Sequence, residues 1–309
     1  MKKIIALAVA GAFAVPAMAA EVSVNGEIEF VYATLDDDAG ANTETVIDNG
    51  NLIEITATEE VDGLTITAGV ELGLDGETDD GAIAGETFVS AQFITIAGEF
   101  GAITVGDTSG ALDNFGDYSD QAPFALGFSG DGSDHALRYD LPTVVPGLRV
   151  SASMTPEDGA FVSGDDEVTA ATDVRTNGVS ADASGFGAAY AFGDGEFYYG
   201  QQTVAATDTT AYGAKYSVSG LYVAYETATV QTAGASDIKH TGYAATYAWN
   251  NMKFIYEDQK STQNAADTAD NSAFAVEYNL GSNVDIFAEQ RDDKFNSDTY
   301  TYVGVEYNF

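Results

Sequence analysis

Apolar and polar residues alternate one by one along segment after segment of this chain. In the last segment, one face holds Thr301, Val303, Val305, Tyr307 and Phe309, and the other holds Tyr300, Tyr302, Gly304, Glu306 and Asn308. The same pattern recurs at 22–32, 64–74 and 221–226. A two-residue period is typical of a β-strand with one apolar face. Charged residues stay off the apolar face, so we expect an all-β fold.

Sixteen such segments are joined by connections that alternate between short and long. The short ones are 60–63, 98–101, 141–146, 193–195, 217–220, 249–251 and 279–283, and the longer ones are 35–50, 76–85, 108–133, 156–175, 205–209, 229–238, 259–271 and 291–298. Tight turns at one end, longer loops at the other and an even strand count are features of transmembrane β-barrels. The sequence therefore predicts a sixteen-stranded antiparallel transmembrane β-barrel.

The first nineteen residues follow a different pattern. Lys2 and Lys3 precede an apolar run at 4–15, and Ala17-Met18-Ala19 resembles a signal-peptidase site. We expect residues 1–19 to be a signal peptide that is removed, and 20–309 to form one barrel domain. No later apolar run approaches the ~20 residues that a membrane-spanning helix needs. A secreted β-sandwich also alternates, but aromatic residues gathered near strand ends, such as Tyr32 and Trp249, favour the barrel.

The formal charge is −38, while the apolar fraction of 45% argues against disorder. Such a charge repels nucleic acid, so no nucleic-acid partner is expected. Nine glutamates lie opposite the apolar faces and are expected to point into the barrel: Glu27, Glu29, Glu54, Glu71, Glu226, Glu257, Glu277, Glu289 and Glu306. Two explanations for the acidity stay open, a pore that attracts cations and a saline habitat.

Several stretches resemble the general-diffusion porins of Gram-negative outer membranes. The terminal Tyr307-Asn308-Phe309 is similar to the family's final strand, 100–106 to the strand before its inner loop, and 136–140 with 147–151 to the following hairpin. The resemblance implies an outer-membrane homotrimer that contacts lipid and lipopolysaccharide and passes small hydrophilic solutes by passive diffusion. It also implies that the barrel-assembly machinery recognises Tyr307 and Phe309.

By the same resemblance, the third outer loop, Thr108–Ser133, folds inward and narrows the pore. The candidate constriction residues are Asp107, Asp113, Asp117, Asp120, Arg138 and Asp140. The family often has a basic residue where Asp107 stands, and Arg138 is the only basic residue near the loop that alternation points inward. We therefore expect a one-signed acidic filter that prefers cations.

Other chemistry is weakly indicated. Acidic clusters at 36–38, 75–80, 131–134 and 165–167 offer calcium ligands in outer loops, but none has the spacing of a dedicated calcium loop, so no metal site is assigned. Ser133-Asp134-His135 contains triad residue types, yet adjacent residues rarely form a triad, so no enzymatic activity is expected. Two alternatives remain: a structural or adhesive surface barrel, and a substrate-specific channel with an aromatic track from Tyr222, Phe287, Tyr300 and Tyr302.

Overall fold

The structure, a computed structural model, describes residues 20–36, 42–74, 89–124, 132–155 and 183–309. Its strands are β1 (Glu21–Asp36), β2 (Asn42–Asp48), β3 (Leu52–Val61), β4 (Leu64–Gly73), β5 (Val89–Gly98), β6 (Gly101–Ser109), β7 (Gly132–Asp140), β8 (Leu148–Thr155), β9 (Ala183–Phe192), β10 (Gly195–Val204), β11 (Thr207–Val218), β12 (Leu221–Thr232), β13 (Ile238–Trp249), β14 (Met252–Gln263), β15 (Ala266–Gly281), β16 (Val284–Asp293) and β17 (Asp298–Asn308). Within these ranges, no helix is long and apolar enough to cross a membrane. The expected signal peptide at 1–19 lies outside the described residues.

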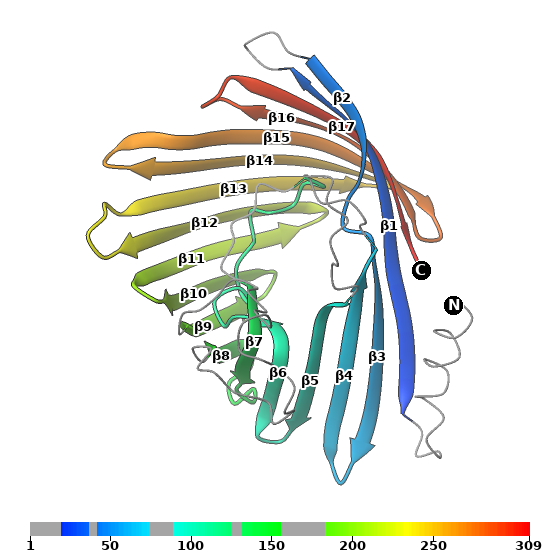
Figure 1. The fold of residues 1–309 in the computed structure, drawn as a ribbon, viewed down its shortest axis with the longest axis vertical. Helices are drawn as coiled ribbons and strands as arrows, with labels where there is room; N and C mark the ends of the chain where they lie inside the picture. Colours follow the sequence, from blue (N-terminus) through cyan, green and yellow to red (C-terminus); the bar gives the residue numbers. More distant parts are fainter. Residues whose placement is uncertain (1–19, 37–41, 75–88, 125–131, 156–182) are drawn as a thin grey trace, which may run out of the picture.

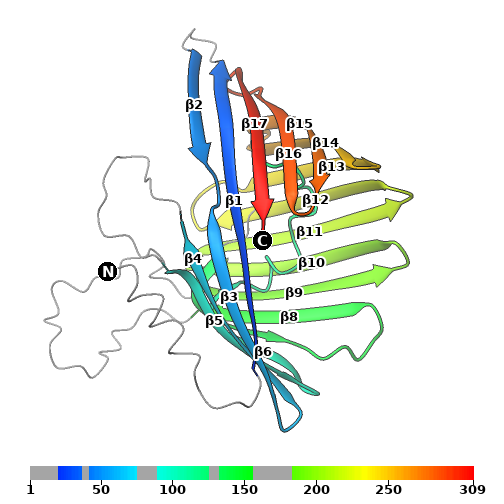
Figure 2. The same cartoon turned by 90° about the vertical axis from the view of Figure 1, so that its right-hand side faces the viewer.

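The strands form one closed antiparallel barrel. From β3 to β17 each strand pairs with the next along the chain, and β1 pairs with β17 through a register that runs from Glu27↔Asn308 to Asp36↔Thr299 (Figures 1 and 2). Closure through β1 and β17 pairs the first and last strands of the sheet, and the bilayer core requires that main-chain groups be satisfied in this way. The prediction of a transmembrane barrel is confirmed.

Strands β2 and β3 are two parts of one barrel strand. The first half of β1 pairs with β3 and its second half with β2. At the break, Gly50 has a positive φ of 66°, and the Asn51 side-chain oxygen accepts a hydrogen bond from the Glu29 main-chain N–H at 2.5 Å. Counting β2 and β3 as one, the seventeen segments make sixteen barrel strands, as the sequence predicted.

The two faces of each strand differ as the alternation predicted. Large apolar side chains are exposed on the outside, for example Phe30, Tyr256 and Phe274 at 48–53% exposure. Their sequence neighbours Glu29, Glu257 and Ala273 are buried on the other face. Outward apolar residues match a lipid environment. We call the opposite face, toward the barrel axis, the inner face.

Several connections at the loop end are shorter than the sequence predicted. The expected loop 259–271 is almost entirely strand, because β14 and β15 continue to a two-residue turn at Asn264–Ala265. Both turn residues have positive φ (53° and 63°), the geometry of a tight hairpin turn. Polar residues on both faces hide the two-residue period here, so the prediction of a loop was wrong. The expected loop 205–209 likewise contracts to a turn at 205–206.

The barrel closes at a seam between Gly26 and the last residue. Gly26 and Phe309 exchange two main-chain hydrogen bonds of 2.9 and 3.0 Å. The Phe309 ring lies over Gly26, in space that a Cβ atom would fill, and stacks on Tyr307 with the ring centroids 6.0 Å apart. Gly26 is therefore needed for the close approach of the terminal aromatic ring.

Candidate functional site

Three buried glutamates stand on alternate strands of the inner face. Glu226 lies on β12, Glu257 on β14 and Glu289 on β16, and their exposed fractions are 0%, 0% and 2%. Buried carboxylates need hydrogen-bond partners to offset the loss of water. These three find them in the connection between β6 and β7.

The described part of that connection, residues 110–124, donates main-chain N–H groups to all three glutamates. Glu226 accepts from Tyr118 N (3.1 Å) and Ser119 N (2.8 Å). Glu257 accepts from Ala122 N (2.6 Å) and from Gln121 N, and Glu289 accepts from Phe124 N (2.9 Å). Hydrogen bonds to an ionised acceptor are shorter and stronger than neutral ones. The segment, which we call the docked segment, is thus held along three strands (Figure 1).

Glycines on the wall make room for the docked segment. A Cβ atom on Gly187 (β9) would collide with Ala111 and Phe115, and one on Gly242 (β13) would collide with Ser119. Three further glycines, Gly185, Gly200 and Gly213, are crowded in the same way, by the docked segment or by neighbouring strands. Main chain approaches main chain most closely where no side chain intervenes. We call these five glycines the glycine stripe. All of them fall on inward positions of their strands, but the alternation of the sequence did not single them out.

Basic side chains also meet the docked segment. Glu196 forms ion pairs with Arg149 (2.9 Å) and Lys215 (3.1 Å) and accepts a hydrogen bond from the Tyr118 hydroxyl at 2.6 Å. The Lys215 ammonium lies 4.0 Å from the centre of the Tyr118 ring. Lys253 donates to the Gln121 carbonyl at 3.4 Å. The expectation that Arg138 alone would be the basic residue near the loop was therefore wrong, because neighbouring strands bring distant bases to it.

Arg138 and Asp140, two of the candidate constriction residues, lie together on β7. They form an ion pair of 3.1 Å, and Arg138 also donates to the Ser109 carbonyl at 3.2 Å. Asp140 accepts a hydrogen bond from Ser151 and one from Asn114 of the docked segment, at 3.3 Å. The positive charge of Arg138 is thus balanced by its neighbour.

Asp113, Asp117 and Asp120 lie on the docked segment itself. Removal from water, together with the charges of Glu226, Asp120 and Asp113, raises the pKa of Asp117 to about 7. Removal from water and the charge of Glu226 raise the pKa of Asp120 to about 6. Near neutral pH Asp117 is therefore only partly ionised, and Asp120 loses charge below neutral pH.

Asp107 takes a different position. It sits at a register shift in β6, and its carboxylate accepts a hydrogen bond from the Gln92 main-chain N–H at 2.9 Å. It shares a surface pocket with Ile94 and Val105, two exposed residues of the outer face. The structure therefore places Asp107 apart from the three aspartates of the docked segment.

The wall formed by β1 to β6 has a different charge composition. The sequence contains no Lys or Arg between Lys3 and Arg138, so these strands carry no base. Glu54 and Glu71 are register partners on β3 and β4, and Thr58, Thr67, Thr95 and Thr104 continue the inner face. Carboxylates placed directly opposite one another repel. We call β1 to β6 the bare wall and β8 to β16 the docked wall.

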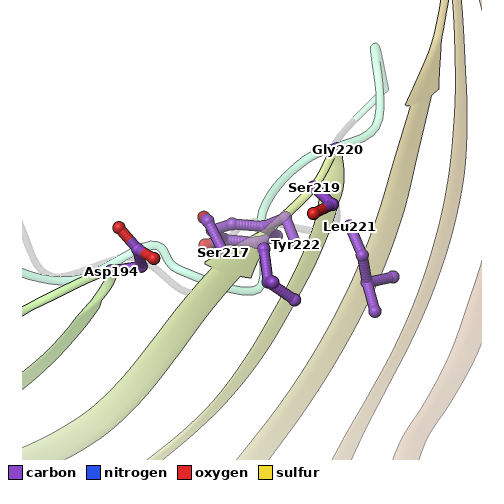
Figure 3. A pocket seen from close by; sticks show the side chains of 7 residues that line it. Asp194, Ser217, Ser219, Gly220, Leu221 and Tyr222 are labelled. Carbon is purple, nitrogen blue, oxygen red and sulfur yellow. The ribbon is translucent and has the colours of Figure 1, made fainter.

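Two further site candidates are an acidic cluster and an open pocket. Carboxylate oxygens of Glu27, Glu29 and Glu306 lie within 4.8 Å of one another near the seam. An open pocket lies between the turns at Asp194 and Ser219, where Figure 3 shows Ser217, Leu221 and Tyr222. Tyr222 donates its hydroxyl to the Tyr118 carbonyl at 2.7 Å, so this pocket adjoins the docked segment. Most of the acidic clusters considered for calcium fall outside the described residues.

Comparisons with known proteins identify the class. A family model described as Gram-negative porin matches residues 6–299. Salmonella typhi OmpF, in complex with daunomycin, superposes with a TM-score of 0.74 at 16% identity, covering 94% of this chain and 98% of that one. An anion-selective porin from Comamonas acidovorans gives 0.68 at 17% identity, and a variant of the Rh. blastica porin gives 0.70 at 16%, each covering 94% of this chain and 100% of the other. No curated sequence matches significantly.

A closed sixteen-stranded barrel with an apolar outer face defines an outer-membrane channel. The chain belongs to the Gram-negative porin family, whose members are channels rather than enzymes, and it is a β-barrel of a Gram-negative outer membrane. The resemblance found in the sequence is confirmed.

Proposed function

We propose that this porin is a passive, water-filled channel for small hydrophilic solutes and ions, and that the docked segment forms its constriction. The observation that carries the proposal is the series of main-chain hydrogen bonds from residues 118–124 to Glu226, Glu257 and Glu289. A segment fixed at three points along the inner face narrows the passage on one side and keeps it open on the other. The third outer loop then acts as a fixed constriction.

We further propose that the pore prefers cations. Three of the bases near the docked segment are paired with carboxylates, in Arg149–Glu196, Lys215–Glu196 and Lys253–Glu277. Glu54 and Glu71 of the bare wall have no base on their own or adjacent strands. Walls of low dielectric constant focus the field of such charges into the aqueous path. The net field of the passage is therefore negative.

The proposed filter thus differs from the initial hypothesis in where its charge lies. Asp113, Asp117 and Asp120 remain candidate filter residues on the docked segment, with Arg138 and Asp140 beside them as a neutral pair. Asp107 is the weakest candidate because it adjoins outer-face residues. Glu54 and Glu71 are added, because a permeating cation passes between the docked segment and the bare wall.

A zero-current potential measured across a planar bilayer with a salt gradient tests this proposal. The wild type is expected to show cation preference that weakens with salt, because the Debye length falls from about 10 Å at 0.1 M to about 3 Å at 1 M. Replacing Asp113, Asp117 and Asp120 together by asparagine should reduce the preference at low salt. Asp107→Asn is the matched control and should change it least. Anion preference in the wild type would refute the proposal.

The assembly of the channel is also proposed. We expect a homotrimer embedded among lipid and lipopolysaccharide, inserted by the barrel-assembly machinery through Tyr307 and Phe309. Unheated detergent samples should migrate as a compact oligomer and shift to monomer after boiling. A monodisperse monomer in mild detergent would contradict the trimer. Calcium added to the sample should leave this behaviour unchanged unless the acidic outer loops bind it.

A further inference from the structure

Unsatisfied polar atoms gather in one patch of the inner face, on β14, β15 and β16. Gln259 Nε2, Asn271 Oδ1, Arg291 Nε and Glu289 Oε1 are buried, and none has a hydrogen-bond partner among the described residues. Gln259 and Asn271 are register partners, and Arg291 is the register partner of Ala273, two residues further along β15. Buried polar atoms are nearly always satisfied, so a concentration of exceptions in one place requires a cause.

The patch combines donors with acceptors. Gln259 Nε2 and Arg291 Nε each offer an N–H group, while Asn271 Oδ1 and Glu289 Oε1 each offer lone pairs. Arg291 makes no ion pair within 4 Å to any described residue, unlike the bases Arg149, Lys215 and Lys253 of the same wall. A free cation would be repelled by Arg291, and a free anion by Glu289. The patch thus fits a neutral ligand whose groups both donate and accept.

Aromatic rings border the patch on its β17 side. The Arg291 guanidinium lies 5.7 Å from the centre of the Tyr300 ring. Tyr300 stacks on Tyr302 with an interplanar angle of 3° and a centroid distance of 6.3 Å, and Tyr302 stacks on Phe124 of the docked segment at 4.0 Å. Tyr302 is 8% exposed and has its face covered, whereas Tyr300 is half-buried and retains accessible surface.

We propose that this patch is a binding site for a pyranose ring within the pore, which we call the ring site. Sugar hydroxyls donate and accept hydrogen bonds, so they satisfy Gln259, Asn271, Arg291 and Glu289 together. The apolar C–H face of a pyranose packs on an aromatic ring such as Tyr300. Pockets that fix a ligand by a few polar groups beside apolar surface are the usual form of small-molecule sites. The ring site rests on the proposed function, because a sugar reaches it only through an open lumen.

The position of the ring site gives it a role in entry. Tyr300 lies two residues from the start of β17, near the hairpin at 294–297, while Phe124 and Glu289 mark the docked segment deeper along the wall. A sugar bound there is held between the loop end of the barrel and the constriction. Flux of sugars would then saturate with concentration, while flux of ions would not.

Ion current through the full-length protein in a planar bilayer tests the ring site, with maltose as the probe. Maltose is expected to reduce the current along a saturating curve, with half-reduction at roughly millimolar concentration, and to add current noise. Glycerol at matched viscosity should reduce the current only in proportion to bulk conductivity. Equal effects of maltose and glycerol would overturn the proposal and leave a hydrated patch only. Reduction by the zwitterion glycine but not by maltose would also overturn it.

Two variants locate the effect. Tyr300→Ala removes the ring, and Asn271→Leu removes the acceptor at nearly constant volume, so each should raise the half-reducing maltose concentration about tenfold. Asn25→Leu, the same change on β1 near the turn end, is the control and should leave it unchanged. Normal ion conductance in all three shows that the barrel is folded. If both site variants keep the wild-type maltose curve, the ring site is wrong while the channel stands; absence of any conductance would instead refute the proposed function.

Discussion

The docked wall and the bare wall use the same residue type in opposite ways. On the docked wall, Glu226, Glu257 and Glu289 are buried and accept main-chain hydrogen bonds from residues 118–124. On the bare wall, Glu54 and Glu71 are half-buried and face one another with no base on β1 to β6. A carboxylate therefore holds a loop on one side of the barrel and, under the proposed function, sets the electric field on the other.

Removing one carboxylate from each wall should separate these two roles and give the largest effect. Glu226→Gln weakens the charge-assisted hydrogen bonds from Tyr118 and Ser119, so it should lower the free energy of unfolding by about 1.5–3 kcal/mol. Glu54→Gln should change it by no more than about 0.5 kcal/mol. Denaturant titration in detergent measures both. Equal losses of stability would mean that the docked segment does not depend on Glu226.

The zero-current potential of the same two variants should respond in the opposite order, with the larger change in Glu54→Gln. Glu54→Gln removes a charge that no base balances, so cation preference should fall. Glu226→Gln changes a charge that is covered by the docked segment, so its direct effect on the potential should be smaller. The comparison of the two walls would fail if Glu226→Gln lowered cation preference while leaving stability intact.

The glycine stripe offers a second contrast between the walls. Gly187→Val keeps strand propensity but places a side chain against Ala111 and Phe115, which should destabilise the protein by about 1–3 kcal/mol through overpacking. Because the docked segment would be displaced, single-channel conductance should also change. Ala97→Val on β5 is the small-to-large control on the inner face of the bare wall. Similar conductance changes in both variants would argue against specific docking.

A change at the seam between β1 and β17 leaves the glutamates of both walls intact, so it separates barrel closure from the roles of the two walls. Deleting Phe309 removes its two main-chain hydrogen bonds to Gly26 and the ring that covers this glycine. If Phe309 also signals assembly, insertion into the outer membrane of cells should fall more than refolding yield in detergent. Equal losses in the two assays would assign Phe309 a packing role only.

The smallest expected effect is a pH dependence of cation preference that comes from the docked segment. The raised pKa values of Asp117, about 7, and Asp120, about 6, mean that both carboxyls gain charge as pH rises from 5 to 8. Cation preference should therefore increase modestly over this range. The variant with Asp117→Asn and Asp120→Asn should show a flatter dependence. A preference that falls as pH rises would contradict the assignment.

The sequence by itself determined the strands and their faces. The two-residue period places Glu226 and Glu54 on the inner face as readily as it places Phe30 on the outer face, because neighbouring side chains of a strand point to opposite sides. It failed at 259–271, where β14 and β15 extend with polar residues on both faces. A one-sided environment is what produces the period, so the signal fades where both faces are polar.

Only the tertiary structure decided which inward residues act together. Alternation gives a direction for each glutamate but not the strand against which residues 110–124 settle, and that choice buries Glu226 and Glu257 while leaving Glu54 and Glu71 facing the passage. It also brought Arg149 and Lys215, far from the loop in sequence, to Tyr118. The physical reason is that docking depends on main-chain donors meeting acceptors across space, and on glycines such as Gly187 and Gly242 that allow the approach.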